Sequence, residues 1–272
     1  MSAGDEPMVI TPDWPAPPRV RCAFTLRSGG VSVPPYDSRN VGAHVGDDVA
    51  AVAENRRRLR EHLRLSAEPV WLQQVHGTGV VDLDMLTGQV RARAVAALGA
   101  MEGGLPADGA LGTMRADAAV TRVGQSVCVI QVADCMPVLF AARDGSAVGA
   151  AHAGWRGLAG GVLEQTVRAL NVPAAGLIAW LGPTISKQHF EVGDDVRTAF
   201  VSVDPGAATS FVINTRGRWQ CDLYELARRR LAALGVRDVF GGEWCTYADS
   251  ARFFSFRRDG QCGRMAALIW LA

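Results

Sequence analysis

Four short apolar segments between residues 118 and 152 constrain the fold of this chain more than any other feature. They read AAVT, SVCVIQVA, PVLFAA and AVGAAH, and Gly, Asp or Pro separates each from the next. Short runs rich in β-branched residues favour buried strands over buried helices. The sequence therefore predicts a central sheet in this part of the chain.

Helical patterns surround this region in irregular order. Asp47 or Asp48 can cap a helix that begins at Val49 and carries an apolar stripe at Val52 and Leu59. Three further helices are expected later in the chain, at 157–170, 194–201 and 221–236. The order lacks a strict strand–helix–strand repeat, so we expect an α+β (mixed α/β) fold with mixed sheets and a single domain, 19–272.

Turn residues mark the remaining predicted elements. Residues 70–83 contain Gly-Thr-Gly between two apolar stretches and read as two short strands. Residues 253–271 read as a hairpin that turns at Asp259-Gly260. Residues 86–116 are rich in Ala and Gly, which indicates a surface excursion.

Composition argues against two classes of partner. The 28 Lys and Arg nearly balance the 27 Asp and Glu, so a net charge of +1 provides no field for nucleic acid or an acidic membrane. Residues 1–18 contain five prolines and resemble no signal peptide, so we expect a flexible N-terminal arm on a cytoplasmic protein. The six cysteines form no C-x-x-C pair and are expected to be free thiols.

Three residues that can bind a metal lie where predicted strands meet loops. His76 directly precedes Gly77, Cys135 follows an apolar strand, and His152 ends the segment AVGAAH. Two imidazoles and a thiolate match zinc sites that keep a fourth position open. Because 59 and 17 positions separate these residues, only the fold can bring them together. Spacing alone leaves two alternatives: a shared metal site, or a buried cysteine and two capping histidines.

The residues around these candidates suggest anion binding. In HAGWRGLAGG, a strand, a Gly-rich turn and a helix present free N–H groups, and Arg156 adds a planar fork for phosphate. A tight turn with an Arg salt bridge fits the same pattern. In FFSFRR, Arg257 or Arg258 lies among aromatics, as in a base-stacking and phosphate pocket or a packed edge strand. Asp134 can orient a histidine, shuttle a proton or cap a turn.

Ten short strings occur in the order of a known family. They are GGVS, NVGAHVGDD, ENRRRL, QQVHG, ADCMPVLF, AHAGWRG, LGPTI, FEVG, CTY and FFSFRRDGQCGR. From about residue 19 to 271 the chain resembles the YfiH-like laccase-domain family, and QVHG, ADCMPV and HAGWRG are its most specific signatures. The chain departs from the family at Cys262, where Thr is common, and at 86–116, which looks longer.

The resemblance implies a fold, a metal and an activity. The fold is a layered α/β/β/α arrangement related to a cysteine-hydrolase toxin domain, and His76, Cys135 and His152 match the zinc ligands. Members are described as purine nucleoside phosphorylases that cleave adenosine, inosine and methylthioadenosine with phosphate, and that also deaminate adenosine. The expected partners are thus purine nucleosides and phosphate, while the oligomeric state stays open.

Other functions fit the same residues. Cys135 with His152 or His76 as base would make a cysteine hydrolase, and the family is also linked to peptidoglycan editing. Members were earlier described as copper polyphenol oxidases, so copper binding in vitro is an alternative to zinc. Several copper centres need more histidines than this chain offers, since it has five. A non-enzymatic interaction protein would tolerate loss of all three ligands.

Overall fold

The structure, a computed structural model, describes residues 8–86 and 114–272, and in these ranges two sheets are stacked between helices. The four-stranded sheet is antiparallel and has the order β1 (Val9–Ile10), β2 (Val20–Thr25), β13 (Met265–Leu271), β5 (Val127–Val132). The six-stranded sheet is mixed and has the order β12 (Asp238–Gly241), β8 (Leu177–Leu181), β6 (Met136–Ala142), β7 (Val148–Ala153), β4 (Ala118–Thr121), β3 (Val80–Asp82).

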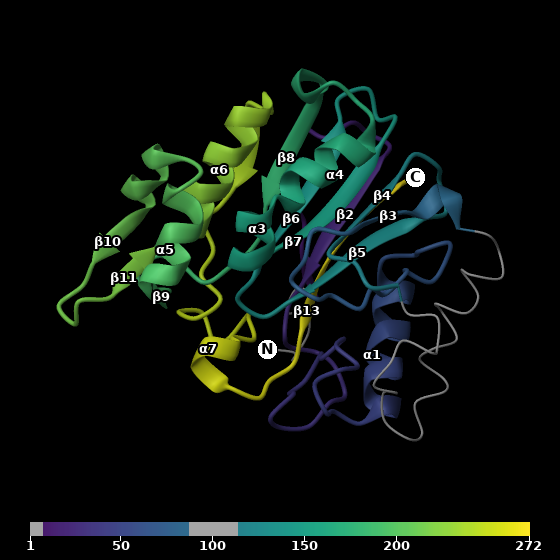
Figure 1. The fold of residues 1–272 in the computed structure, drawn as a ribbon. Helices are drawn as coiled ribbons and strands as arrows, with labels where there is room; N and C mark the ends of the chain where they lie inside the picture. Colours follow the sequence, from purple (N-terminus) through teal and green to yellow (C-terminus); the bar gives the residue numbers. More distant parts are fainter. Residues whose placement is uncertain (1–7, 87–113) are drawn as a thin grey trace.

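Helices cover the outer faces of both sheets, with one helix on the four-stranded sheet and several on the six-stranded sheet (Figure 1). Helix α1 (Val49–His62) packs on the four-stranded sheet. The six-stranded sheet is covered by α3 (Trp155–Gly160), α4 (Val162–Leu170) and α6 (Leu223–Leu234). Beside them lie α5 (Asp194–Val201) and a three-stranded sheet of β10 (Phe211–Ile213), β11 (Trp219–Cys221) and β9 (Glu191–Val192). The predicted α/β/β/α layering is confirmed.

Strand residues alternate between the layers, as the two-residue period of a strand requires. In β13, Met265, Ala267 and Ile269 pack between the two sheets, whereas Ala266 and Leu268 face α1. In β6, Leu139 and Ala141 face the four-stranded sheet. Val138, Phe140 and Ala142 face the α4 layer. The four apolar segments form β4 to β7, as predicted. Three of them lie in the six-stranded sheet, whereas β5 belongs to the four-stranded sheet.

The first predicted helix is confirmed at its N-terminus, where the Asp48 carboxylate accepts a hydrogen bond of 2.8 Å from the Ala51 backbone N–H. The helix predicted at 157–170 is interrupted, because Gly161 has a left-handed backbone (φ 99°) that separates α3 from α4. Short 3₁₀ turns lie at Leu83–Met85, Ala174–Gly176 and Pro205–Ser210. No helix among the described residues has both the length and the apolar character needed to span a membrane.

Within the expected N-terminal arm, Val9 and Ile10 pair with β2. Two other expectations were wrong in detail. Of the two strands predicted in 70–83, only β3 forms, and Gln73 makes an isolated bridge to Arg115. The expected hairpin is instead a short helix, α7 (Phe256–Asp259), followed by a loop and β13. Residues 1–7 and 87–113 lie outside the described residues.

Candidate metal centre

The fold brings the three predicted ligands together. His76 lies in the loop before β3, Cys135 directly precedes β6, and His152 lies in β7 opposite Pro137. Their ligand atoms all lie within 4.8 Å of one another, and Cys135 Sγ is 3.8 Å from His76 Nε2. The imidazole rings meet edge to face, with centroids 4.8 Å apart. His152 is buried, Cys135 half-buried and His76 exposed, so the cluster opens to solvent on one side.

The spacing of these atoms fits a zinc ion. Zn–N bonds of about 2.0 Å and Zn–S bonds of about 2.3 Å place tetrahedral ligands roughly 3.5 Å apart. Two nitrogens and one sulfur make a donor set of borderline softness, which zinc prefers over magnesium or calcium. The three residues present therefore fit a zinc site with one coordination position left for another molecule.

Local charges favour the thiolate form of Cys135. Burial alone raises the pKa of its thiol, but the neighbouring His152 and His76 outweigh that effect and lower the pKa to about 6. Burial also lowers the pKa of His152, whereas the Cys135 thiolate and the hydrogen bond to Asp117 raise it overall. In contrast, burial raises the pKa of Cys22 and Cys128. Among the six thiols, none of which forms a disulfide, Cys135 is thus poised for ligation or attack.

Asp117 contacts two members of the cluster, His152 and His76, and no sequence pattern pointed to it. Its buried carboxylate lies 2.9 Å from His152 Nδ1, so Nε2 is the nitrogen left for the metal side. It also accepts backbone hydrogen bonds from Val75, His76 and Gly77 at 3.2, 2.9 and 2.7 Å. These bonds hold His76 in a left-handed conformation (φ 58°). A carboxylate that orients a ligating histidine is common around zinc.

Gly154, the residue before α3, allows the helix to approach the cluster. A Cβ at this position would lie 2.7 Å from Cys135 Sγ and 3.3 Å from His76 Cδ2. Any larger residue would displace the sulfur or the imidazole. Close approach of the backbone, rather than anion binding, therefore explains part of the Gly-rich pattern.

Gly154→Ala is expected to weaken zinc binding by about tenfold or more while the protein stays folded, because the new methyl group moves a ligand. Competition with a chromophoric chelator measures this affinity. Gly176→Ala is a matched control, since its Cβ would make an ordinary contact of 3.4 Å with Val172. Unchanged zinc affinity in folded Gly154→Ala protein would contradict the placement of Cys135 Sγ.

Asp134 is buried and fully engaged in local structure. Its carboxylate accepts hydrogen bonds from Thr246 Oγ1 and from the Arg257 backbone N–H, both at 2.6 Å. Its backbone oxygen accepts from the Thr184 hydroxyl and the Ile185 N–H. Its backbone is left-handed (φ 84°), which turns the chain from β5 toward Cys135. These contacts favour a role in positioning Cys135 over proton transfer.

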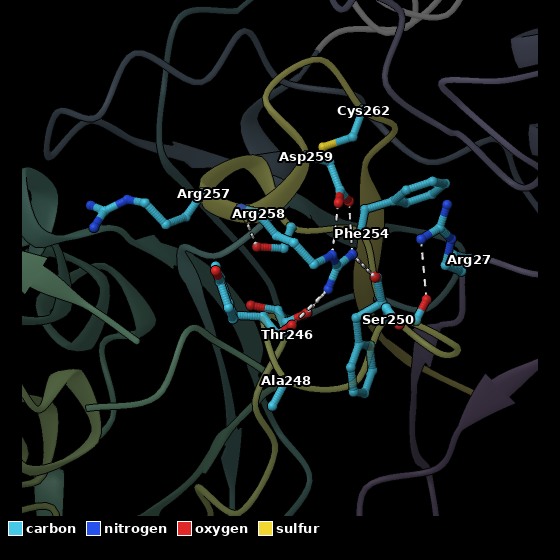
Figure 2. Close-up of polar contacts among 12 residues, drawn as sticks. Arg27, Thr246, Ala248, Ser250, Phe254, Arg257, Arg258, Asp259 and Cys262 are labelled. Atoms are coloured by element: carbon cyan, nitrogen blue, oxygen red, sulfur yellow. Dashed lines mark hydrogen bonds and ion pairs between the residues drawn. The ribbon is translucent and has the colours of Figure 1, made fainter. Parts of the chain in front are cut away.

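The three arginines singled out from the sequence differ in their surroundings. Arg258 is saturated: it binds the Asp259 carboxylate and the carbonyls of Thr246, Tyr247 and Phe253 (Figure 2). The Arg257 side chain points away from Arg258 and its partners, and it donates to the Glu191 carbonyl at 2.9 Å (Figure 2). Arg156 is exposed and lies over the Trp155 ring, 4.4 Å from its centroid.

A small cavity of about 130 Å³ opens beside the cluster. Cys135, Gly154 and Asp134 form one wall, and Trp155, Phe190 and Phe256 supply aromatic surface. Arg257 also lines it, whereas Arg156 does not. An apolar cavity with a thiolate and a cation at its wall suits a flat, polar ring system.

Comparison with known proteins gives consistent matches. Residues 21–272 match the family described as multi-copper polyphenol oxidoreductase laccase. The purine nucleoside phosphorylase PA4543 of Pseudomonas aeruginosa is 50% identical over 96% of this chain and 98% of its own length. The purine nucleoside phosphorylase YfiH of Escherichia coli is 46% identical over 97% and 98%.

Solved structures agree with the fold. The Neisseria meningitidis protein NMB0706 superimposes with a TM-score of 0.84 at 46% identity and covers 97% of this chain and 99% of its own. YlmD from Geobacillus stearothermophilus gives a TM-score of 0.84 at 31% identity, with 98% and 97% covered. Chains this similar in length and fold share one architecture throughout.

Proposed function

The chain belongs to the family described as multi-copper polyphenol oxidoreductase laccase, and we propose that it is a zinc-dependent purine nucleoside phosphorylase. Its substrates are adenosine, inosine and methylthioadenosine, which it cleaves with phosphate to the free base and (methylthio)ribose 1-phosphate. A side activity deaminates adenosine. The names of relatives at 46–50% identity support the reaction class.

One observation carries the proposal: His76, Cys135 and His152 converge within 4.8 Å beside a cavity with aromatic walls. A zinc ion held by these residues would supply Lewis-acid chemistry at its open position. Asp117 fixes the imidazole of His152, and the three backbone bonds to Asp117 fix His76. Phe190 and Phe256 offer surfaces for the purine, and Arg257 can hold a polar group at the cavity wall.

The same cluster does not support a multi-copper oxidase. Electron transfer to dioxygen over several copper ions needs several groups of histidine ligands. Within the residues that the structure describes, His76, Cys135 and His152 form the one group of three or more ligating side chains close enough to share a metal. We therefore place copper, if it binds, in the zinc site.

Product analysis tests the reaction type. With phosphate present, inosine is expected to yield hypoxanthine and ribose 1-phosphate; without phosphate, base release should fall to background. Chromatography of the base and a ribose 1-phosphate assay measure both products. Free ribose formed at the same rate without phosphate would overturn the proposal.

A cysteine hydrolase is the second candidate, because His152 and His76 lower the pKa of Cys135 to about 6. The two candidates differ in their response to zinc. A nucleophilic thiolate is blocked when it ligates the metal, so a hydrolase would gain activity on chelation. A phosphorylase that uses the metal would lose it.

A further inference from the structure

A second cavity of about 420 Å³ lies next to the first, and Phe256 lines both. Its other walls include His44 and Arg264, and none of the residues that line it is acidic. Phe256 is 57% exposed, so it is not part of the core and forms an edge that the two cavities share. Molecules bound in the two cavities would be neighbours.

Arg264 is held with one edge of its guanidinium free. Its Nη1 donates to the carbonyls of Cys262 and Gly263, at 2.9 and 3.0 Å. Among the described residues, neither Nε nor Nη2 has a hydrogen-bond acceptor, and no carboxylate forms an ion pair with this side chain. The Nε–Nη2 edge is the fork that matches two oxygens of a phosphate. The guanidinium also lies 5.8 Å from the centroid of the Phe256 ring, which leaves this edge available to an oxyanion at the cavity wall.

The segment that carries His44 also holds Arg264 in place. Asn40, which is buried, accepts a hydrogen bond of 2.8 Å from the Arg264 backbone N–H. The Val41 N–H donates to the Arg264 carbonyl at 3.1 Å. Gly42 leaves room for the aliphatic part of Arg264, whose Cγ would be 2.6 Å from a Cβ at that position. These contacts fix Arg264 to the segment that carries His44.

Arg264 is the cation among the residues that line this cavity, and Arg56 lies close enough to affect His44. His44 is exposed at its mouth, yet partial burial lowers the pKa of its imidazole, and Arg264 and Arg56 lower it further. Arg56 is buried, donates to the Val41 carbonyl and lies 3.7 Å from the centroid of the Trp71 ring, with no ion pair among the described residues.

Nearby carboxylates are occupied elsewhere. Asp47 accepts from Ser32 and Asn40, and Asp259 binds Arg258. Because Arg264 lines the cavity and no acidic residue does, the cavity favours an anion.

We propose that this second cavity is the phosphate-binding subsite, with the Nε–Nη2 edge of Arg264 as its main ligand and His44 as a second donor. The inference rests on the proposed phosphorylase activity and places phosphate at Arg264, whereas the sequence pattern favoured Arg156.

In the reaction, an oxygen of hydrogen phosphate bonds to ribose C1′. The C1′–N9 bond breaks with its electron pair on the purine, which leaves with the proton of the phosphate. A nucleoside beside Cys135 and a phosphate beside Arg264 would lie in adjacent cavities that share Phe256.

Arg264→Lys tests the subsite, because lysine keeps the charge but lacks the fork. The Michaelis constant for phosphate should rise about tenfold or more, whereas that for inosine should change by less than about twofold. Arg264→Ala should raise the phosphate constant further. Arg168→Ala, which removes an exposed arginine on α4, serves as the control. Thermal unfolding and zinc content confirm that each variant is folded and loaded.

A phosphate constant within about twofold of wild type in folded, zinc-loaded Arg264→Lys would overturn the subsite. If the constant rises instead in Arg156→Ala, phosphate lies at the start of α3. Calorimetric titration with inorganic phosphate separates this question from the reaction itself. Should wild type release no base but bind phosphate, with binding lost in Arg264→Lys, the phosphorylase proposal fails and the anion site stands.

Discussion

Cys135→Ser is expected to abolish stable zinc binding and to lower phosphorolysis by about a thousandfold or more. A serine hydroxyl stays protonated at neutral pH and is a poor zinc ligand, whereas the Cys135 thiol has a pKa of about 6. A thousandfold loss of rate corresponds to about 4 kcal/mol. Elemental analysis after dialysis measures the metal.

Cys22→Ser is the matched control for this substitution. Cys22 is also a half-buried free thiol, but its sulfur accepts a hydrogen bond from Trp14 and lies outside the cluster. Its zinc content and activity should equal those of wild type. Full zinc occupancy in Cys135→Ser would show that the thiolate is not a ligand.

Asp117→Asn should cost both metal affinity and stability. The carboxylate of Asp117 is fully buried and accepts bonds from three backbone N–H groups and from His152. An amide places an N–H₂ where one of these donors points, so one buried contact becomes repulsive. We expect zinc affinity to fall by about 10–100-fold and the free energy of unfolding to drop by roughly 3 kcal/mol.

Chelator competition and denaturant unfolding measure these two effects. Asp84→Asn provides a comparison, since Asp84 also accepts hydrogen bonds, from Thr121 and Arg122, but is only partly buried and lies outside the cluster. It should lose stability without losing zinc affinity. Equal zinc affinity in Asp117→Asn and wild type would show that His152 needs no orienting carboxylate.

Local patterns predicted much of the fold. The strands β4 to β7 and the α1 cap at Asp48 each depend on signals within a few residues. Local spacing left the metal site open, and the family resemblance implied His76, Cys135 and His152 as its ligands. The prediction for 253–271 was wrong because tertiary contacts override the Asp259-Gly260 turn signal. The Ser255 side chain caps α7 by accepting from the Arg258 N–H, and the Asp134 carboxylate accepts from the Arg257 N–H.

Other parts of the site depend on long-range contacts that no local pattern shows. Asp117 meets His152 from 35 positions away and Gly77 from 40. In the sequence it reads only as a polar residue before a strand. Arg264 is anchored to Asn40, 224 positions away. The sequence does not distinguish Arg258 from Arg257 as a candidate for binding phosphate. In the structure, every N–H group of the Arg258 guanidinium donates a hydrogen bond within the protein.

The zinc dependence of the reaction is tested most directly by titrating metal-free protein with zinc while following ribose 1-phosphate formation from inosine and phosphate. The rate should rise in proportion to bound zinc and level off at one zinc per chain, because one cluster of His76, Cys135 and His152 serves the reaction. A metal-free protein that forms ribose 1-phosphate at the full rate would contradict the account.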